Sequence, residues 1–218
     1  MATPSSGTIS LNEMHVEAGG GSGTQCSIND SDIRLIANKS SGAQTAWGDY
    51  YSRAADWSST MTVGDNTISE SNGYVTVVTR FRGYMTSTAI NATAVPSGGI
   101  GSMNDYQDSD YLANSVIDVL AVYGDQSGSS SLFRLQIYNG TISNNDTAFK
   151  SVIVNGTTFN RTDASFGQNN NADRVYTIWS WSLSAAVPDA SSDAYAPFGV
   201  SGASNTITFR RSRWVRLN

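Results

Sequence analysis

The clearest β-hairpin in the sequence is Val152-Ile153-Val154-Asn155-Gly156-Thr157-Thr158-Phe159. The Asn-Gly pair readily takes the positive φ values that a type I′ turn requires, and β-branched residues lie on both sides of it. The stretch therefore predicts two antiparallel strands joined by a two-residue turn.

Further strands are expected on both sides of this hairpin, because β-branched and aromatic residues either alternate with polar ones or form short apolar runs. The expected strands span residues 58–63, 74–82, 115–123, 132–138, 175–183 and 206–217. Residues 98–110 are expected to form a loop. About seven or eight strands at hairpin-like spacing predict an antiparallel β-sandwich or a jelly-roll-like domain.

The strand expected at residues 175–183 has two faces, because side chains alternate along a strand. Trp179 and Trp181 lie on the face that we expect to point into the core, and Tyr176 lies on the opposite face. Tyr176 and the loop residue Tyr106 are therefore candidates for aromatic side chains that contact a glycan.

The first 57 residues follow another pattern, in which a short sequence motif occurs twice. Ile9-Ser10-Leu11-Asn12-Glu13 returns as Cys26-Ser27-Ile28-Asn29-Asp30. Each copy places a small polar residue ahead of an apolar-periodic stretch and an acid in the first turn, so both predict the start of a short helix. Residues 19–21 and 40–42 are expected to end these helices, and residues 46–51 are expected to form a third turn.

The chain is therefore expected to be mainly β, with a helical module at residues 1–57 followed by a β-sandwich domain at residues 58–218. Charged residues make up only 14% of the 218 residues, which is typical of strand-and-turn proteins. Ten Tyr, seven Phe and five Trp residues supply enough apolar area for a β core of ordinary size.

The composition also excludes several functions. A net charge of -5 argues against nucleic-acid binding, which needs a basic surface. The single cysteine, Cys26, rules out an internal disulfide, and with the single histidine, His15, it is too little for a zinc site. His15 completes a catalytic pair only if it reaches a nucleophile in another segment. No apolar run approaches the ~20 residues of a membrane span, so no membrane insertion is expected.

Acidic residues are the remaining route to metal binding or catalysis. Asp105, Asp108 and Asp110 form the densest acidic cluster, and their spacing suggests a calcium loop or, more simply, a solvated loop. No pair of carboxylates stands out by spacing as a glycosidase pair. We therefore expect a protein without catalytic activity, cofactor or bound metal.

Several N-terminal stretches together resemble the N-terminal module of small virion structural and tail-associated proteins of tailed bacteriophages. They are Pro4-Ser5-Ser6-Gly7-Thr8-Ile9-Ser10-Leu11-Asn12-Glu13, Glu17-Ala18-Gly19-Gly20, Asn29-Asp30-Ser31-Asp32-Ile33-Arg34 and the aromatic block at residues 47–51. The resemblance covers roughly the first quarter of the chain. It implies a structural, non-enzymatic virion protein. We also expect the protein to be assembled in the host cytoplasm, to form a homo-oligomer and to dock to other virion proteins.

The tail or a tail fibre is the expected location, and a head decoration or neck protein is an alternative. A second alternative is a receptor module that binds a host-surface glycan, and a third is a small glycan hydrolase. A C-terminal stretch, residues 210–216, holds four of the thirteen basic residues, and either protects a strand edge or docks to a neighbouring subunit. The residues predicted to dock are Leu11, Met14, Ile33, Ile36, Trp47, Arg210, Arg211, Arg213, Trp214 and Arg216.

Overall fold

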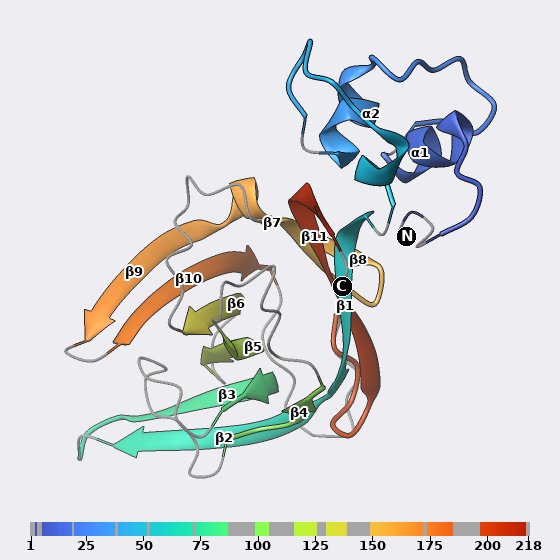
Figure 1. Cartoon of the computed structure of the whole chain (residues 1–218). Coiled ribbons are helices and arrows are strands. Elements are labelled where there is room, and N and C mark those ends of the chain that lie inside the picture. The colour runs from blue at the N-terminus through green and yellow to red at the C-terminus, as the bar shows by residue number, and fades with distance from the viewer. Residues whose placement is uncertain are drawn as a thin grey trace. The chain divides into compact units, whose positions relative to one another are not determined.

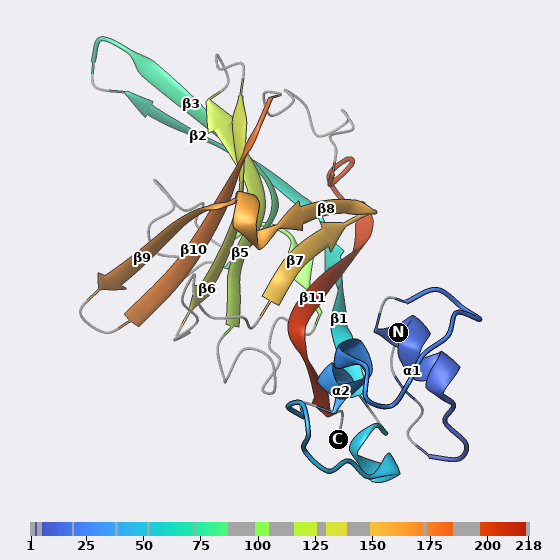
Figure 2. The same ribbon diagram turned by 90° about the horizontal axis from the view of Figure 1, so that it is seen from above.

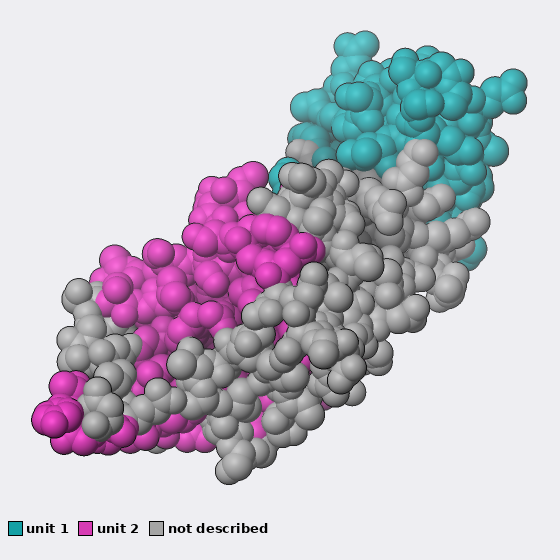
Figure 3. Space-filling model, turned by 90° about the vertical axis from the view of Figure 1, so that its left-hand side faces the viewer, with its two compact units in different colours: residues 1–57, 147–150, 209–218 teal, residues 58–146, 151–208 magenta. Residues whose placement is uncertain are grey.

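The structure is a computed structural model of the whole chain, and it forms two compact units (Figures 1 and 3). One unit consists of residues 1–57, 147–150 and 209–218, and the other of residues 58–146 and 151–208. The structure describes residues 3, 6–18, 20–37, 39–51, 53–71, 73–86, 99–104, 116–125, 130–138, 149–171, 174–184 and 197–216. The change of sequence pattern after residue 57 coincides with a boundary between the units, but the first unit also includes two later segments.

The first unit begins with three short helical segments. They are α1 (Leu11–Glu17), α2 (Ser31–Ile36) and a 3₁₀ helix, η1 (Trp47–Asp49). Both predicted helices and the predicted third turn are therefore present. Because helices of this length are marginal on their own in water, they need side-chain caps and packing to persist.

An acidic side chain closes the turn at each of three places in this unit. Its carboxylate accepts the backbone N–H of the residue three positions earlier, as in Ser10–Glu13 (2.7 Å), Ser27–Asp30 (2.7 Å) and Ala46–Asp49 (2.9 Å). At Ser10 the capping box is complete, because the Ser10 hydroxyl oxygen also accepts the Glu13 backbone N–H. The second helix begins at Ser31, later than its sequence phrase suggested, because Asp30 first closes a turn and then occupies the N-cap position.

The helices of the first unit pack around a small apolar core. Met14, Ile33, Ile36 and Tyr50 are fully buried there, and Ile9 and Ala37 are nearly so. The guanidinium of Arg34 is also buried, and it binds the chain that follows α2. Its Nη2 donates to the carbonyl oxygens of Ser40 and Ala43, both at 2.5 Å.

Eleven strands form two antiparallel sheets that pack as a sandwich among the described residues, which confirms the predicted fold class. The five-stranded sheet has the order β4 (Ser102–Met103), β1 (Arg53–Thr62), β11 (Ser204–Arg216), β7 (Phe149–Val154) and β8 (Thr157–Asn160). The six-stranded sheet has the order β2 (Gly64–Ser71), β3 (Thr76–Met85), β5 (Val116–Asp125), β6 (Ser131–Tyr138), β10 (Arg174–Leu183) and β9 (Ser165–Asn171). Figure 1 shows the strands of the six-stranded sheet side by side in this order, and Figure 2 shows the same ribbon from above.

The predicted Asn-Gly hairpin is confirmed as β7–β8. Asn155 and Gly156 have φ values of 47° and 80°, as a type I′ turn requires, and Val154 pairs with Thr157. The Asn155 amide also donates to the Pro197 carbonyl at 2.9 Å, so the turn is fixed to another segment of the same unit. The prediction missed β2, β4 and β9, and β4 lies inside the expected loop at 98–110.

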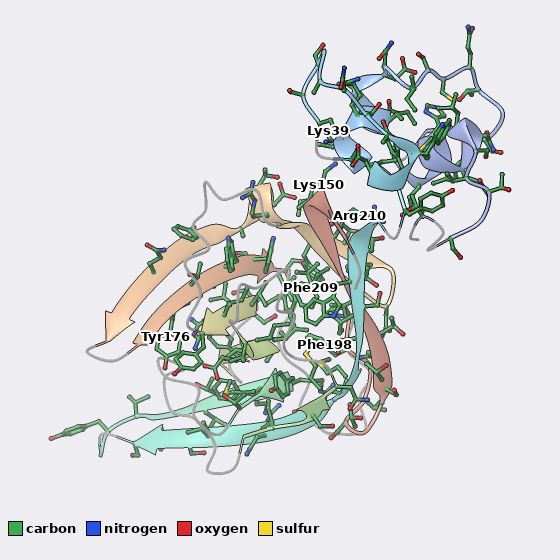
Figure 4. All side chains as sticks on the ribbon, viewed as in Figure 1. Lys39, Lys150, Tyr176, Phe198, Phe209 and Arg210 are labelled. Atoms are coloured by element: carbon green, nitrogen blue, oxygen red, sulfur yellow. The ribbon has the colours of Figure 1, made fainter. Side chains whose placement is uncertain are left out.

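Four aromatic side chains join the two sheets within the second unit. Phe133 of β6 lies 4.2 Å from Phe159 of β8, 5.1 Å from Trp181 of β10 and 5.7 Å from Phe198, measured between ring centroids. Figure 4 shows Phe198 between the sheets. Because Phe159 follows the Asn-Gly turn by three positions, the hairpin also supplies a main contact between the sheets.

Three glycines allow backbone segments to approach closely in the second unit. Gly64 pairs with Gly83 between β2 and β3, and a Cβ on Gly64 would lie 2.1 Å from the Gly101 backbone nitrogen. Gly83 and Gly101 both have positive φ, at 136° and 62°, and a Cβ on either would lie 2.4 Å from a carbonyl oxygen.

Candidate functional site

The apolar residues predicted to dock fall into two groups in the structure. Met14, Ile33 and Ile36 are fully buried in the core of the first unit, so the prediction that they contact a partner is wrong. Met14 lies on α1 and Ile33 and Ile36 lie on α2, and so short a module needs these apolar side chains for its own core. Leu11 packs partly buried beside the same core, and Trp47 is 53% exposed.

The arginine-rich segment forms the end of β11. Arg210 is half exposed, and its Nε and Nη2 donate to the two carboxylate oxygens of Asp56 at 3.1 and 3.2 Å. This hydrogen bonding raises the pKa of Arg210. The side chains of Arg211, Arg213, Trp214 and Arg216 lie outside the described part of the structure, so their predicted docking role stays a prediction.

His15 does reach another segment's hydroxyl group. Its Nδ1 lies 3.0 Å from Asp32 Oδ2 and its Nε2 lies 2.8 Å from Thr24 Oγ1, which gives the outline of a nucleophile–base–acid triad. In a working triad the imidazole accepts the hydroxyl proton. Here the Thr24 hydroxyl donates to the Gly21 carbonyl at 2.7 Å, and which atom donates between Thr24 Oγ1 and His15 Nε2 depends on the imidazole tautomer. The contacts of His15 with Asp32 and Thr24 therefore link α1, the loop that contains Gly21 and Thr24, and α2.

The two tyrosines expected to contact a glycan do not form a site. Tyr176 is fully buried, with its ring 5.6 Å from that of Tyr138, so the expectation that it faces solvent is wrong. Strand alternation placed it correctly on the face opposite the tryptophans, but both faces of this strand are covered at that position. Tyr106 lies outside the described residues.

The described residues also contain no cluster of side chains that could bind a metal ion. Within those ranges, no three His, Cys, Asp or Glu side chains are grouped so as to hold a metal ion. The Asp105, Asp108 and Asp110 loop falls outside the ranges, and its calcium prediction stays open. No described helix has the length and apolar character needed to cross a bilayer.

A polar hollow of about 270 Å³ lies where the chain passes from one sheet to the other. The edge strand β8 leads through a single 3₁₀ turn, Arg161–Asp163, into β9, the edge strand of the six-stranded sheet. The register between β9 and β10 ends at Ser165–Ser180, so residues 181–183 extend past the end of β9 and form one wall. The lining residues are Thr158, Phe159, Asn160, Asp163, Ser165, Ser180, Trp181, Ser182 and Leu183, which we call the β8–β10 hollow.

Hydrogen bonds hold the polar groups of this hollow in place. Asp163 Oδ2 accepts the Asn160 side-chain amide at 3.0 Å, and Asp163 Oδ1 accepts the Thr162 hydroxyl at 3.3 Å. The Trp181 indole N–H donates to the Asn160 carbonyl at 2.6 Å. The sequence analysis missed this hollow, because its lining comes from four segments and the only local pattern is an Asn and an Asp three residues apart.

Comparison of the chain with protein-family models, with curated proteins and with solved structures gave no match.

Proposed function

We propose that the protein is a non-enzymatic structural component of a tailed-bacteriophage particle, in the tail or a tail fibre, and that its N-terminal unit docks to a neighbouring virion subunit. The resemblance of residues 4–51 to phage N-terminal modules motivates the proposal. One structural observation supports docking in particular, which is the exposed tryptophan on a unit that already has its own core.

The N-terminal unit leaves two large apolar side chains in solvent although its core is complete. Trp47 is 53% exposed and Leu35 is 47% exposed, whereas Met14, Ile33, Ile36 and Tyr50 are fully buried. Fully burying a large apolar side chain contributes about 1.5–3 kcal/mol, and tryptophan is among the residue types enriched in interface hot spots. A partner with an apolar recess would therefore gain binding energy by covering Trp47 and Leu35.

The short helix η1 holds Trp47 in a defined position. Asp49 accepts the Ala46 backbone N–H, and its carboxylate also lies 3.6 Å from the Lys39 ammonium. The Trp47 ring lies 6.4 Å from the ring of the buried Tyr50, at an interplanar angle of 57°. Such preorganisation favours binding, because less side-chain entropy is lost when a partner covers the ring.

The test is incorporation of the chain into purified virus particles. Trp47→Ser, introduced into the virus that encodes the chain, is expected to lower the amount of chain per particle at least tenfold, since hot-spot truncations cost about 2 kcal/mol or more. Quantitative mass spectrometry of purified particles measures the ratio of this chain to the major capsid protein.

Tyr74→Ser is the matched control, because Tyr74 is a 96% exposed aromatic in the other unit, between β2 and β3. It should leave incorporation unchanged. Particles that lack the wild-type chain would refute the virion assignment. Particles that incorporate the Trp47→Ser chain at the wild-type level would refute docking through this residue.

A further inference from the structure

From the chemistry of the β8–β10 hollow, we propose that it is a binding site for one sugar ring of a neutral saccharide. This assignment stands on the hollow alone, within the second unit, and does not depend on membership of a virus particle.

The lining combines hydroxyl, amide and carboxylate groups with aromatic carbon. Thr158, Ser165, Ser180 and Ser182 each carry a hydroxyl that can donate and accept, Asn160 adds an amide, and Asp163 adds a carboxylate. Phe159 and Trp181, which are largely buried against Phe133, border the hollow with small patches of apolar surface. A sugar ring presents the matching pattern, since its many hydroxyl groups both donate and accept hydrogen bonds.

Asp163 is the group best placed to orient such a ligand. A carboxylate offers about four acceptor positions, and the contacts with Asn160 and Thr162 use two of them. The same contacts fix the plane of the carboxylate before a ligand arrives. Two neighbouring sugar hydroxyls can therefore donate to the ionised carboxylate, whose oxygens accept stronger hydrogen bonds than neutral acceptors do.

Charge and size narrow the ligand class further. No basic side chain belongs to the described lining, so a phosphate, a sulfate or an acidic sugar would meet only the negative charge of Asp163. A divalent metal would find a single carboxylate, fewer charged ligands than such ions normally require. The volume of about 270 Å³ lies just below the ~300 Å³ at which pockets for drug-sized ligands begin, which suits one ring.

The experiment uses the full-length protein on a printed array of neutral and acidic saccharides, followed by saturation-transfer NMR with free glucose, galactose, mannose and N-acetylglucosamine. We expect binding to neutral saccharides with a dissociation constant in the millimolar range or tighter. Asp163→Asn keeps the shape of the side chain and removes its charge, and it should weaken binding about tenfold.

Ser182→Tyr is expected to fill the hollow and abolish binding. Its matched control is Thr206→Tyr, since Thr206 is also a small, exposed hydroxyl residue in a strand but does not line the hollow. Tyrosine is well tolerated in strands, and equal thermal unfolding midpoints will verify that both variants fold. Three results would each overturn the assignment: no neutral saccharide binds, binding survives Ser182→Tyr, or Thr206→Tyr weakens binding as much as Ser182→Tyr does.

Discussion

In the N-terminal unit, polar side chains close the turns of short helices, whereas in the second unit aromatic side chains join two hydrogen-bonded sheets. Around its small apolar core, the first unit uses carboxylates that accept backbone N–H groups and one buried guanidinium. The second unit also buries a guanidinium, that of Arg82, but its two sheets are joined by apolar contact between Phe133 and three other rings. The difference shows that, even in a sequence with few charged residues, charged side chains can hold the backbone in place through hydrogen bonds. It also implies that the two units respond to different kinds of mutation.

The largest effect is expected from Phe133→Ala in the second unit. The substitution removes the ring that contacts Phe159, Trp181 and Phe198, and truncations of this kind cost about 3–5 kcal/mol of unfolding free energy. Urea unfolding followed by tryptophan fluorescence measures the change. Phe133→Leu, which keeps most of the volume, should cost less than half as much. If both variants unfolded at the wild-type midpoint, apolar contact would not be the main link between the sheets.

An intermediate effect is expected from Arg34→Met in the first unit. Methionine keeps an apolar side chain but removes the donors to the Ser40 and Ala43 carbonyls, and hydrogen bonds of a charged group contribute about 1.5–3 kcal/mol. Hydrogen exchange of peptides that cover residues 9–37 should become faster, because the unit opens more often.

Arg34→Lys serves as the control, because it keeps the charge but has a single ammonium in place of the planar fork. It should fall between the wild type and the methionine variant. Exchange in Arg34→Met that matched the wild type would show that apolar packing alone holds this unit, and the comparison with the second unit would fail.

The smallest effect is expected at Glu13 and should appear as a pH dependence. Hydrogen bonds from the Ser10 backbone and side chain lower the pKa of Glu13 from its ordinary value of 4.5. A lowered pKa in the folded state means that the ionised group stabilises the fold above pH 4.5 and that this stabilisation is lost as the pH falls through the lowered pKa. Glu13→Gln should therefore remove part of the acid sensitivity of the first unit.

Two-dimensional NMR of the Ser10 amide over an acid titration checks this prediction. Glu17 contributes with the opposite sign, because burial raises its pKa and its stabilising effect is lost as the pH rises above 4.5. Glu17→Gln is therefore the informative control. An acid titration of the Glu13→Gln protein identical to that of the wild type would contradict the capping role of the carboxylate.

The sequence predicts the strands whose own residues have a high β-propensity. It misses the polar strands that form only by pairing with a neighbouring strand. β10 and the β7–β8 hairpin are rich in β-branched and aromatic residues and are found where they were expected. β9 is mostly Asn, Gln, Gly and Ser, and it forms because β10 offers it a complete set of backbone partners from Ser180 to Arg174. β2 is similarly polar and pairs with β3.

The sites divide in the same way between local and tertiary information. Met14 of the first helix and Ile33 and Ile36 of the second can be recognised in the sequence as apolar helix positions, but whether they face a partner or their own module depends on tertiary packing. Trp47 is also predicted to dock, and its half-exposed position likewise follows from tertiary packing. The β8–β10 hollow depends on which residues meet where the chain changes sheets, and no spacing within the sequence records that.

The contact of Gly64, Gly83 and Gly101 limits how this protein can change over generations. At most crowded positions, a larger residue becomes acceptable once a neighbouring side chain is trimmed by a second substitution. Here the atoms nearest to Gly64 and Gly101 belong to backbone, and every residue type carries those atoms. A second substitution to a smaller side chain therefore cannot make room for a larger residue at Gly64 or Gly101. We expect both glycines to be retained while the residues around them are substituted.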